Sequence, residues 1–448
     1  MTKREALNGK PYAGNPHVRF DEGEAASTAT SRRGSLLYKL VVVCRAFCRD
    51  FMILRWQKMA RQYPDINITL IGSAEYVMPA NQWGKEKVLG LRSFKEGNFE
   101  FIAAQWRGGF WRGGYRVVGL IGKLKELKPD FLYMIGAENA DFLFQAIIAR
   151  ALYFRDCKLA MFTMRGTDMP MRDLNFRLRW FFSKCFIDAY FTHSPCCVHV
   201  LKRQGRVWQP IYMQTQVGVN TEIFKSDLKA RIEIRRKYNV EDDVFLFGTA
   251  CRIDVRKGLL EMLEALPLPG IKWKFLICGS GPDEQILKNK IKERGIEENV
   301  ILAGNVPGYE QMNRHFNAMD CFVLMSQTIP KTNVDTYPLV VSQSMASAKP
   351  QIVSDSGGLP YEVGSLGWVV HERNVEELHK AMVYAATHPE ECKDRGAKLK
   401  KRLEHSFALT NLNPLFIATV KDIMSGKYDM SHIDQTRAEP TYTYAEFL

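Results

Sequence analysis

The sequence lacks several features that define common protein classes. No stretch approaches the ~20 uninterrupted apolar residues of a membrane-spanning helix. The 10 cysteines include no C-x2-C pair at zinc spacing, which predicts reduced thiols rather than a zinc site or a disulfide framework. The turn "CGSGPDE" has only two of the three glycines of a dinucleotide fingerprint, and no Ser-His-Asp arrangement stands out. These absences argue against a membrane span, a zinc module, NAD binding and a serine hydrolase.

Positive charge is present, but it is unevenly distributed. Residues 39–225 hold 28 Lys and Arg against 15 Asp and Glu, so 28 − 15 = +13, whereas residues 226–448 hold 28 against 30, so 28 − 30 = −2. The asymmetry predicts a polyanionic or membrane-surface partner for the first half. No nucleic-acid recognition motif accompanies the charge, so nucleic acid is not the expected partner.

Short β-type runs alternate with helical patterns along the chain. The predicted strands are 39–44, 67–72, 99–104, 130–136, 158–164 and 188–193, followed by 244–250, 273–279, 299–304, 321–326, 350–355 and 367–370. Strands that alternate with crossover helices make parallel sheets. We therefore predict an α/β fold with two tandem Rossmann-like, doubly wound lobes, whose strand carboxyl ends face a cleft.

Composition divides the chain into four parts. Residues 1–38 are rich in Gly, Pro, Ser, Thr and charge and are predicted to form a disordered leader. The first lobe is placed at 39–222 and the second at 223–405, with a polar, turn-rich connection at about 212–243. Residues 406–448 are predicted to form a further helix and a polar tail.

Two turns of the second half carry candidate ligand-binding residues. Arg252 and Lys257 lie in "GTACRIDVRKG", directly after the first strand of that half. Two cations at the carboxyl end of a strand can hold a diphosphate and stabilise it as it leaves. Gly279 and Gly281 lie between a strand and a helix, where the backbone can approach an anionic ligand. The alternative for both turns is a solvated connection without a ligand.

The stretch "DTYPLVVSQSMA", which begins at Asp335, is more specific. Tyr337, Pro338 and Leu339 are predicted to start a helix whose free N–H groups can bind a phosphate. Asp335 can accept hydrogen bonds from sugar hydroxyls, and Gln343, about two helical turns later, can reach ribose hydroxyls. The alternative is an N-capping Asp335 and a surface Gln343.

Taken in order, these stretches resemble the donor half of the family 4 glycosyltransferases, which have the GT-B fold. The family pattern runs G-R-L-x3-K-G, G-x-G-P, G-x-V, A-D-x4-P-S, a Glu-x7-Glu segment and G-G-x-P-E. The counterparts here are "ACRIDVRKG", "GSGP", "GNV" ending at Val306, "AMDCFVLMS", "DTYPLVVSQ" and "GGLPYE". The paired glutamates of the family correspond to Asp335 and Gln343, which favours an active enzyme with an altered donor preference.

The resemblance implies a retaining transfer of a sugar from a nucleotide-diphosphate donor. It assigns catalysis to Arg252, Lys257 and Asp335, and donor binding to Gly279, Gly281, Val306, Tyr337, Pro338, Leu339 and Gln343. No D-x-D motif, which enzymes of the other common transferase fold use to hold a metal, occurs in the chain. The expectation is therefore a metal-independent transfer, with no cofactor besides the nucleotide-sugar substrate.

Three residues of the first half are candidates for the acceptor side. Family members often carry H-G-x-D after the fifth strand, and "MRGTDMP" has Arg165 in place of the histidine and Asp168 at the acid. Arg165 stays protonated, so it cannot be a general base, but it can bind an acceptor phosphate or carboxylate. Glu138 ends the fourth predicted strand and is expected to point into the cleft. A capping Asp168 and a surface Arg165 are the alternative.

Two basic, aromatic segments of the first half suggest contact with an anionic membrane. "QWRGGFWRGGYR" repeats aromatic, Arg and Gly-Gly and is predicted to be a mobile loop. The segment 171–186 is predicted to be a basic amphipathic helix, with core packing as the alternative. It places Phe176, Leu178, Trp180, Phe181 and Phe182 among Arg172, Arg177, Arg179 and Lys184.

The sequence thus predicts a cytoplasmic glycosyltransferase, peripheral at the inner face of the cell membrane. It would move a hexosyl or related sugar to a glycan or lipid-linked acceptor in cell-surface polysaccharide or lipopolysaccharide biosynthesis. Two alternatives stay open. One is a nucleotide-sugar 2-epimerase, against which Arg165 argues, and the other is a catalytically silent carbohydrate-binding scaffold, which Gln343 and Arg165 favour.

Overall fold

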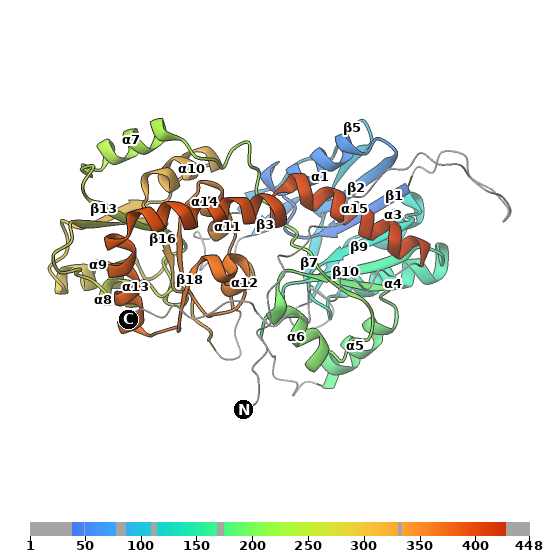
Figure 1. The fold of residues 1–448 in the computed structure, drawn as a ribbon. Helices are drawn as coiled ribbons and strands as arrows, with labels where there is room; N and C mark the ends of the chain where they lie inside the picture. Colours follow the sequence, from blue (N-terminus) through green and yellow to red (C-terminus); the bar gives the residue numbers. More distant parts are fainter. Residues whose placement is uncertain are drawn as a thin grey trace, which may run out of the picture. The chain divides into compact units, whose positions relative to one another are not determined.

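The computed structural model contains two predominantly parallel sheets, each covered by helices (Figure 1). It describes residues 38–48, 50–77, 87–108, 114–167, 174–329 and 334–426. All twelve predicted strands are present within one or two residues of their expected ends. The predicted doubly wound α/β fold is confirmed.

The first lobe is built on an eight-stranded sheet in the order β12-β11-β10-β9-β1-β2-β6-β5. Its strands are β1 (Tyr38–Cys44), β2 (Ile66–Ser73), β5 (Phe94–Glu96), β6 (Phe99–Ala104), β9 (Phe131–Ile135), β10 (Lys158–Thr163), β11 (Ala189–Thr192) and β12 (Ile211–Met213). Only β5, at one edge, pairs antiparallel. Alternate residues of β1 enter different cores, Leu40 and Val42 on one face and Val41 and Val43 on the other. The sheet is therefore buried on both faces, as expected of a parallel sheet.

Helices cover both faces of this sheet. They are α1 (Asp50–Gln62), α3 (Leu120–Leu127), α4 (Asp141–Tyr153), α5 (Leu174–Cys185) and α6 (Pro195–Arg203). Two short hairpins, β3 (Glu75–Val77) with β4 (Lys87–Leu89) and β7 (Trp106–Gly108) with β8 (Tyr115–Val117), extend from it. The aromatic and Gly-Gly repeat thus supplies two paired arms, and its centre, 109–113, lies outside the described residues.

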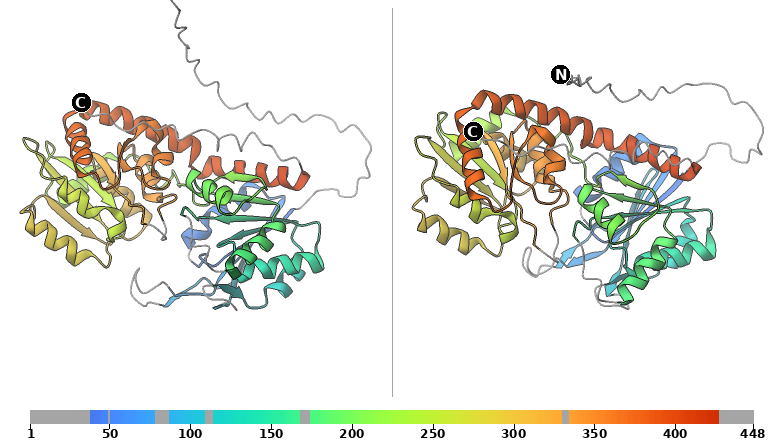
Figure 2. Two further views of the ribbon diagram at one scale, coloured as in Figure 1. Left: turned by 90° about the horizontal axis from the view of Figure 1, so that it is seen from below. Right: turned by 60° about the horizontal axis from the view of Figure 1, so that its bottom comes forward.

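The last helix, α15 (Leu409–Ser425), completes the core of the first lobe (Figure 2). Phe416 is fully buried and its ring lies 5.5 Å from that of Trp56 on α1. Arg55, also on α1 and nearly buried, donates from Nε to Asn413 of α15 at 3.0 Å. The boundary predicted at residue 406 therefore separates this helix from the core that it helps to fill. Sequence order alone does not reveal that the chain returns to the first lobe.

Helix α5 lies at the predicted position, but it is oriented differently from the predicted membrane helix. Its basic residues Arg179 and Lys184 are used inside the lobe: Arg179 pairs with Asp141, and Lys184 Nζ donates to the carbonyl of Gly205 at 3.0 Å. Trp180 is buried beneath them. The prediction that Arg179 and Lys184 face a membrane is wrong, because both charges have protein partners. Arg172 lies outside the described residues.

The second lobe contains a six-stranded parallel sheet in the order β15-β14-β13-β16-β17-β18. The strands are β13 (Phe245–Ala250), β14 (Trp273–Cys278), β15 (Val300–Gly304), β16 (Cys321–Leu324), β17 (Gln351–Ser354) and β18 (Trp368–Val370). The helices are α7 (Leu228–Lys237), α8 (Leu259–Glu264), α9 (Glu284–Glu293), α10 (Tyr309–Ala318), α11 (Leu339–Ala346), α12 (Leu359–Val363), α13 (Val375–Thr387) and α14 (Pro389–Ser406), with 3-10 turns η1 (Val255–Lys257) and η2 (Gly364–Leu366). In chain order the strands are arranged 3-2-1-4-5-6, as in dinucleotide-binding α/β folds.

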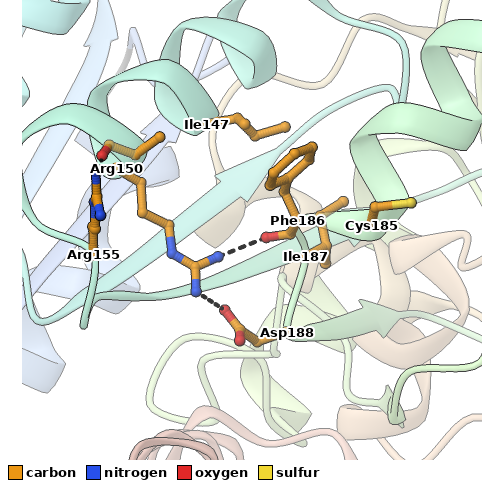
Figure 3. Close-up of a pocket in the computed structure, with 8 residues that line it drawn as sticks. Ile147, Arg150, Arg155, Cys185, Phe186, Ile187 and Asp188 are labelled. Atoms are coloured by element: carbon orange, nitrogen blue, oxygen red, sulfur yellow. Dashed lines mark hydrogen bonds and ion pairs between the residues drawn. The ribbon is translucent and has the colours of Figure 1, made fainter.

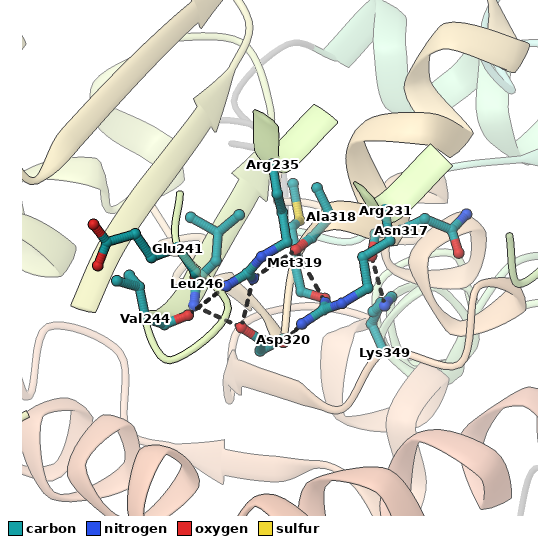
Figure 4. Close-up of polar contacts among 10 residues, drawn as sticks. All are labelled: Arg231, Arg235, Glu241, Val244, Leu246, Asn317, Ala318, Met319, Asp320 and Lys349. Carbon is teal, nitrogen blue, oxygen red and sulfur yellow. Dashed lines mark hydrogen bonds and ion pairs between the residues drawn. The ribbon is translucent and has the colours of Figure 1, made fainter. Parts of the chain in front are cut away.

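The connection expected to be polar and turn-rich contains strand β12 and helix α7. Asp227 caps α7 by accepting a hydrogen bond from the backbone of Ala230 at 3.0 Å. Arg231 and Arg235 of α7 then pair with Asp320, the residue before β16, at 2.7 and 3.1 Å (Figure 4). These charges pair with one another at the amino ends of the strands, and they attach α7 to the lobe there. The cluster does not involve the carboxyl ends of the strands.

Among the described residues, no helix is both long and apolar enough to cross a membrane.

Candidate active site

A lysine and an aspartate form an ion pair at the carboxyl end of the second sheet. Lys257 ends the turn η1 that follows β13, and Asp335 lies between β16 and α11. Lys257 Nζ is 2.5 Å from Oδ2 of Asp335, and the hydroxyl of Ser326 donates to the same oxygen. The two side chains keep 17% and 28% of their exposure, so a ligand can still reach the pair.

Arg252 belongs to the same turn as Lys257. Its Nη1 lies 3.5 Å from Oδ2 of Asp254, and its Nε is buried without a hydrogen-bond partner. Asp254 also accepts two hydrogen bonds from Arg256, at 2.8 and 2.7 Å, and these lower its pKa to about 2. The structure therefore places the two predicted cations in one turn, each paired with a different carboxylate. The sequence analysis missed Asp254 and Arg256, although the carboxylate two residues before an arginine was a usable signal.

The predicted glycines have a structural role at this edge of the sheet. A Cβ on Gly279 would lie 1.9 Å from the carbonyl oxygen of Cys251, and one on Gly281 would lie 2.1 Å from that of Ile253. No larger residue fits without moving one of the two turns. Close packing against the turn that carries Arg252 is thus a sufficient reason for both glycines, and their predicted contact with a ligand stays a prediction.

A second pair of glycines supports Asp335 from the other side. A Cβ on Gly357 would lie 2.2 Å from the carbonyl oxygen of Asp335, and one on Gly358 would lie 1.9 Å from that of Thr336. The backbone N–H of Gly358 donates to the Asp335 carbonyl at 2.8 Å. The turn after β17 thereby fixes the backbone that presents the carboxylate.

Helix α11 begins at Leu339 with Pro338 as its N-cap, as the sequence predicts. The hydroxyl of Tyr337 lies 2.9 Å from that of Ser342, which donates to Oε2 of Glu362 at 2.8 Å. Glu362 is fully buried, and this burial raises the pKa of its carboxyl group well above the usual value. Glu362 was quoted in "GGLPYE" but not identified as a site residue; its place behind α11 depends on packing between distant segments.

Two further donor-side candidates lie near this edge. Gln343 is only 5% exposed, so it is not the surface glutamine of the alternative interpretation. Val306 follows β15 and packs, half-buried, against the core of the second lobe. Their contacts with a nucleotide stay predictions.

In the first lobe, Glu138 holds Arg165 in place. Glu138 follows β9 and is fully buried, and its carboxylate accepts hydrogen bonds from Nε and Nη2 of Arg165 at 3.2 and 3.0 Å and from Thr163 at 2.5 Å. The hydroxyl of Ser183 on α5 donates to the Glu138 carbonyl at 3.0 Å. Glu138 was expected to point into the cleft; it is instead a buried support for the arginine. Asp168 lies outside the described residues.

The sequence analysis did not single out His193, which follows β11. Its ring stacks on Tyr337 of the second lobe at 5.3 Å and 13°, and its Nδ1 lies 3.0 Å from the hydroxyl of Thr215. Burial lowers the pKa of His193 to about 3, so the ring is neutral at pH 7. A buried neutral imidazole without a carboxylate partner suits packing beside Tyr337 better than proton transfer.

Comparison with known proteins shows what the second lobe and the fold are similar to. Residues 230–402 match the family model for glycosyl transferases group 1. Trehalose synthase of Pyrococcus horikoshii is 25% identical over 248 residues, which cover 52% of this chain and 57% of that protein. The GDP-mannose-dependent alpha-(1-6)-phosphatidylinositol monomannoside mannosyltransferase of Mycobacterium tuberculosis is 27% identical over 173 residues, 37% of this chain and 44% of that one.

The match to solved structures extends further along the chain. The structure of Anabaena Alr3699/HepE in complex with UDP superimposes with a TM-score of 0.64 at 14% identity, covering 86% of this chain and 100% of that one. The sequence matches, by contrast, span only 33% to 57% of the length of the first curated relatives. The structural likeness shows the fold, and the family model places the Lys257 and Asp335 turns within its range. The chain therefore has the GT-B fold, and its residues 230–402 match the family model for glycosyl transferases group 1.

Proposed function

We propose that the protein transfers a sugar from a nucleotide-diphosphate donor to a glycan or lipid-linked acceptor, with retention of anomeric configuration. The observation that carries the proposal is the grouping of Arg252, Lys257 and Asp335 at one edge of the second sheet. A diphosphate needs cations and a sugar needs a hydrogen-bond acceptor, and this edge offers both through two separate ion pairs, Arg252 with Asp254 and Lys257 with Asp335.

The two cations act on the leaving group. As the bond between the anomeric carbon and the diphosphate breaks, negative charge develops on the phosphate oxygen. Lys257 Nζ and the guanidinium group of Arg252, whose side chain is 16% exposed, can stabilise it, together with the N–H groups at the start of α11. Protein cations would then replace a metal ion, so we propose a metal-independent transfer.

Asp335 and Gln343 act on the donor itself. Asp335 keeps a partly exposed carboxylate that can accept from sugar hydroxyls, and the amide of Gln343 can both donate to and accept from ribose. The acceptor oxygen would form its bond to the anomeric carbon on the face that the diphosphate leaves. Its proton would pass to the departing phosphate oxygen, which accounts for every atom without a protein base.

Arg165 supplies a fixed positive charge on the acceptor side. The buried carboxylate of Glu138 holds the guanidinium through two hydrogen bonds, so little side-chain freedom is lost when an anion binds. An acceptor with a phosphate or carboxylate fits this arrangement, and a lipid-linked diphosphate is one such acceptor. We also propose that the protein works peripherally at the cytoplasmic face of the cell membrane, in the assembly of a cell-surface polysaccharide or lipopolysaccharide.

A panel of nucleotide sugars incubated with the full chain and lipid-linked acceptors tests the proposal. The expected result is release of nucleoside diphosphate that depends on the acceptor, with a product whose anomeric configuration matches the donor by NMR. Donor binding without turnover on any acceptor would instead indicate a silent scaffold. Release of a free epimerised sugar would indicate an epimerase.

A further inference from the structure

Exposed apolar side chains gather on one part of the first lobe. Seventeen large hydrophobic side chains are exposed among the described residues, and nine of them come from α4, from α5 with the turn after it, and from Trp208. The nine are Ile148, Leu152, Tyr153, Leu174, Leu178, Phe181, Phe182, Phe186 and Trp208. Single exposed hydrophobic residues are common, but a group of this size on neighbouring elements indicates an interaction surface.

Helix α5 presents a complete apolar stripe to solvent. Leu174, Leu178, Phe181 and Phe182 follow the i, i+4, i+7, i+8 spacing of one helix face, and their exposures run from 47% to 65%. The opposite side of the helix is anchored by Trp180, which is 2% exposed. The helix is therefore held to the lobe by one apolar side and leaves a second one uncovered.

The stripe continues into its neighbours on both sides. Lys184 Nζ lies 5.3 Å from the ring of Phe181 and 4.8 Å from that of Trp208, which joins these two aromatic rings around one cation. On the other side, Phe186 lines an open pocket with Ile147, Arg150 and Arg155 of the α4 side (Figure 3). Arg150 is held there by the Phe186 carbonyl at 2.7 Å and by Asp188 at 3.0 Å.

Exposed cations surround the apolar residues. Arg177 on α5, Arg155 after α4, and Lys202, Arg203 and Arg206 at the end of α6 are all exposed. Residues 174–208 contain six Lys and Arg but a single acidic residue, Asp188, which pairs with Arg150 and Lys158. Four of these six, Arg177, Lys202, Arg203 and Arg206, are exposed, so the apolar stripe of α5 has a basic border, while on the α4 side the exposed Asp156 lies next to Arg155 in the sequence.

We propose that these residues, the α4–α5 surface, lie on an anionic lipid bilayer. A helix of 12 residues is about 18 Å long, so α5 can lie in the membrane plane with its phenylalanines among the acyl chains. The basic border then meets the lipid phosphates. This proposal rests on the peripheral membrane association proposed above and names the surface that makes the contact. Exposed cations such as Arg177 take the role that the sequence had suggested for Arg179 and Lys184.

The charge pattern favours a bilayer over a second copy of the chain. In a two-fold contact the same surface meets itself, so the basic borders of both copies would oppose one another. An anionic membrane removes that repulsion. Its fluid acyl chains also accommodate apolar side chains without requiring a surface of complementary shape.

The test is cosedimentation of the full chain with vesicles of phosphatidylglycerol and phosphatidylcholine, or of phosphatidylcholine alone. The wild type should pellet with the anionic vesicles, and less at high salt, because exposed charges are screened within ~10 Å at 0.1 M. The triple variant Leu178→Ser, Phe181→Ser, Phe182→Ser should partition at least tenfold more weakly. A matched triple variant in the second lobe, Leu228→Ser, Ile232→Ser, Ile286→Ser, removes similarly exposed apolar residues and should pellet like the wild type.

A charge variant, Arg177→Gln with Arg206→Gln, should weaken binding about fivefold for each residue and reduce the salt dependence. Donor binding, measured in parallel, should be unchanged in all variants. If even the wild type binds no donor while vesicle binding follows these expectations, the proposed function fails but the membrane-binding surface is supported. Wild-type pelleting of the α5 triple variant would overturn the inference. The inference would also be overturned if the wild type formed a dimer and bound no vesicles, and the α5 triple variant converted that dimer to a monomer.

Discussion

Each lobe places a cation beside a carboxylate at the carboxyl ends of its strands, but the two pairs differ in burial. In the second lobe, Lys257 and Asp335 remain 17% and 28% exposed. In the first lobe, Arg165 is 13% exposed and Glu138 is fully buried. The exposed carboxylate can itself bind substrate, whereas the buried one can act only through the arginine that it holds.

The difference separates two uses of the same chemistry. A buried ion pair contributes through the partner it orients, and its loss leaves an uncompensated charge. A partly exposed pair adds little to stability, and its carboxylate remains accessible to a ligand. The following predictions test this contrast, from the largest expected effect to the smallest.

Glu138→Ala should destabilise the protein by about 3–5 kcal/mol, because it leaves Arg165 and Thr163 without their buried partner. The free energy of unfolding from urea titration measures this. Glu222→Ala is the matched control, since Glu222 pairs with Lys58 at the surface with 76% exposure, and should have little effect. Equal stability of both variants would remove the distinction between the two carboxylates.

Lys257→Ala and Arg252→Ala should each reduce turnover at least tenfold, because losing a preorganised cation commonly costs ~3 kcal/mol of transition-state stabilisation. Steady-state rates of nucleotide release measure the effect. Lys272→Ala, which removes a lysine with 68% exposure, should leave the rates unchanged. Turnover at the wild-type rate in both active-site variants would remove this turn from the mechanism.

Asp335→Asn should change the free energy of unfolding by less than about 1 kcal/mol, because the pair with Lys257 is partly exposed. The same change should reduce turnover, since the amide has one acceptor oxygen instead of two and carries no negative charge. Asp335→Glu should preserve activity better than asparagine does. A large loss of stability without loss of activity would make this pair a structural one like Glu138 and Arg165.

The smallest expected effect is that of EDTA, which should leave nucleotide release largely unchanged. The reason is that Arg252, Lys257 and the start of α11 are proposed to stabilise the leaving diphosphate. Rates before and after chelation, and after addition of manganese or magnesium, provide the measurement. Complete loss that a metal restores would contradict this mechanism.

The sheets and the turns at the carboxyl end of the second sheet were predictable because their signals are local. Apolar runs such as Leu40–Val43 and the glycine pairs of the βα turns identify themselves within a few residues. The short strands β5 and β12 escaped prediction, since three residues carry no periodicity. Helix α7 also escaped, because its sequence "LKARIEIRRK" is mostly charged, although Asp227 marks its start.

Side-chain orientation was less predictable than position. Glu138 was correctly placed at a strand end, but its burial depends on Thr163 and Ser183, which lie on other elements. Lys184 on α5 was assigned to the wrong environment for the same reason, since its carbonyl partners follow α6. Such contacts join distant segments, and no local pattern contains them.

The return of α15 to the first lobe has a consequence for synthesis on the ribosome. Phe416, Ile417, Val420 and Ile423 fill the same core as β1 and α1, yet they are made only after the whole second lobe. At about 5–20 residues per second, the 210 residues that follow Met213, up to Ile423, take about 10 to 40 s. Until then one face of the first sheet lacks the part of its cover that α15 provides, although α1 already packs on it. We expect chains arrested before α15 to be aggregation-prone and to bind chaperones, although every strand of both sheets has already been made.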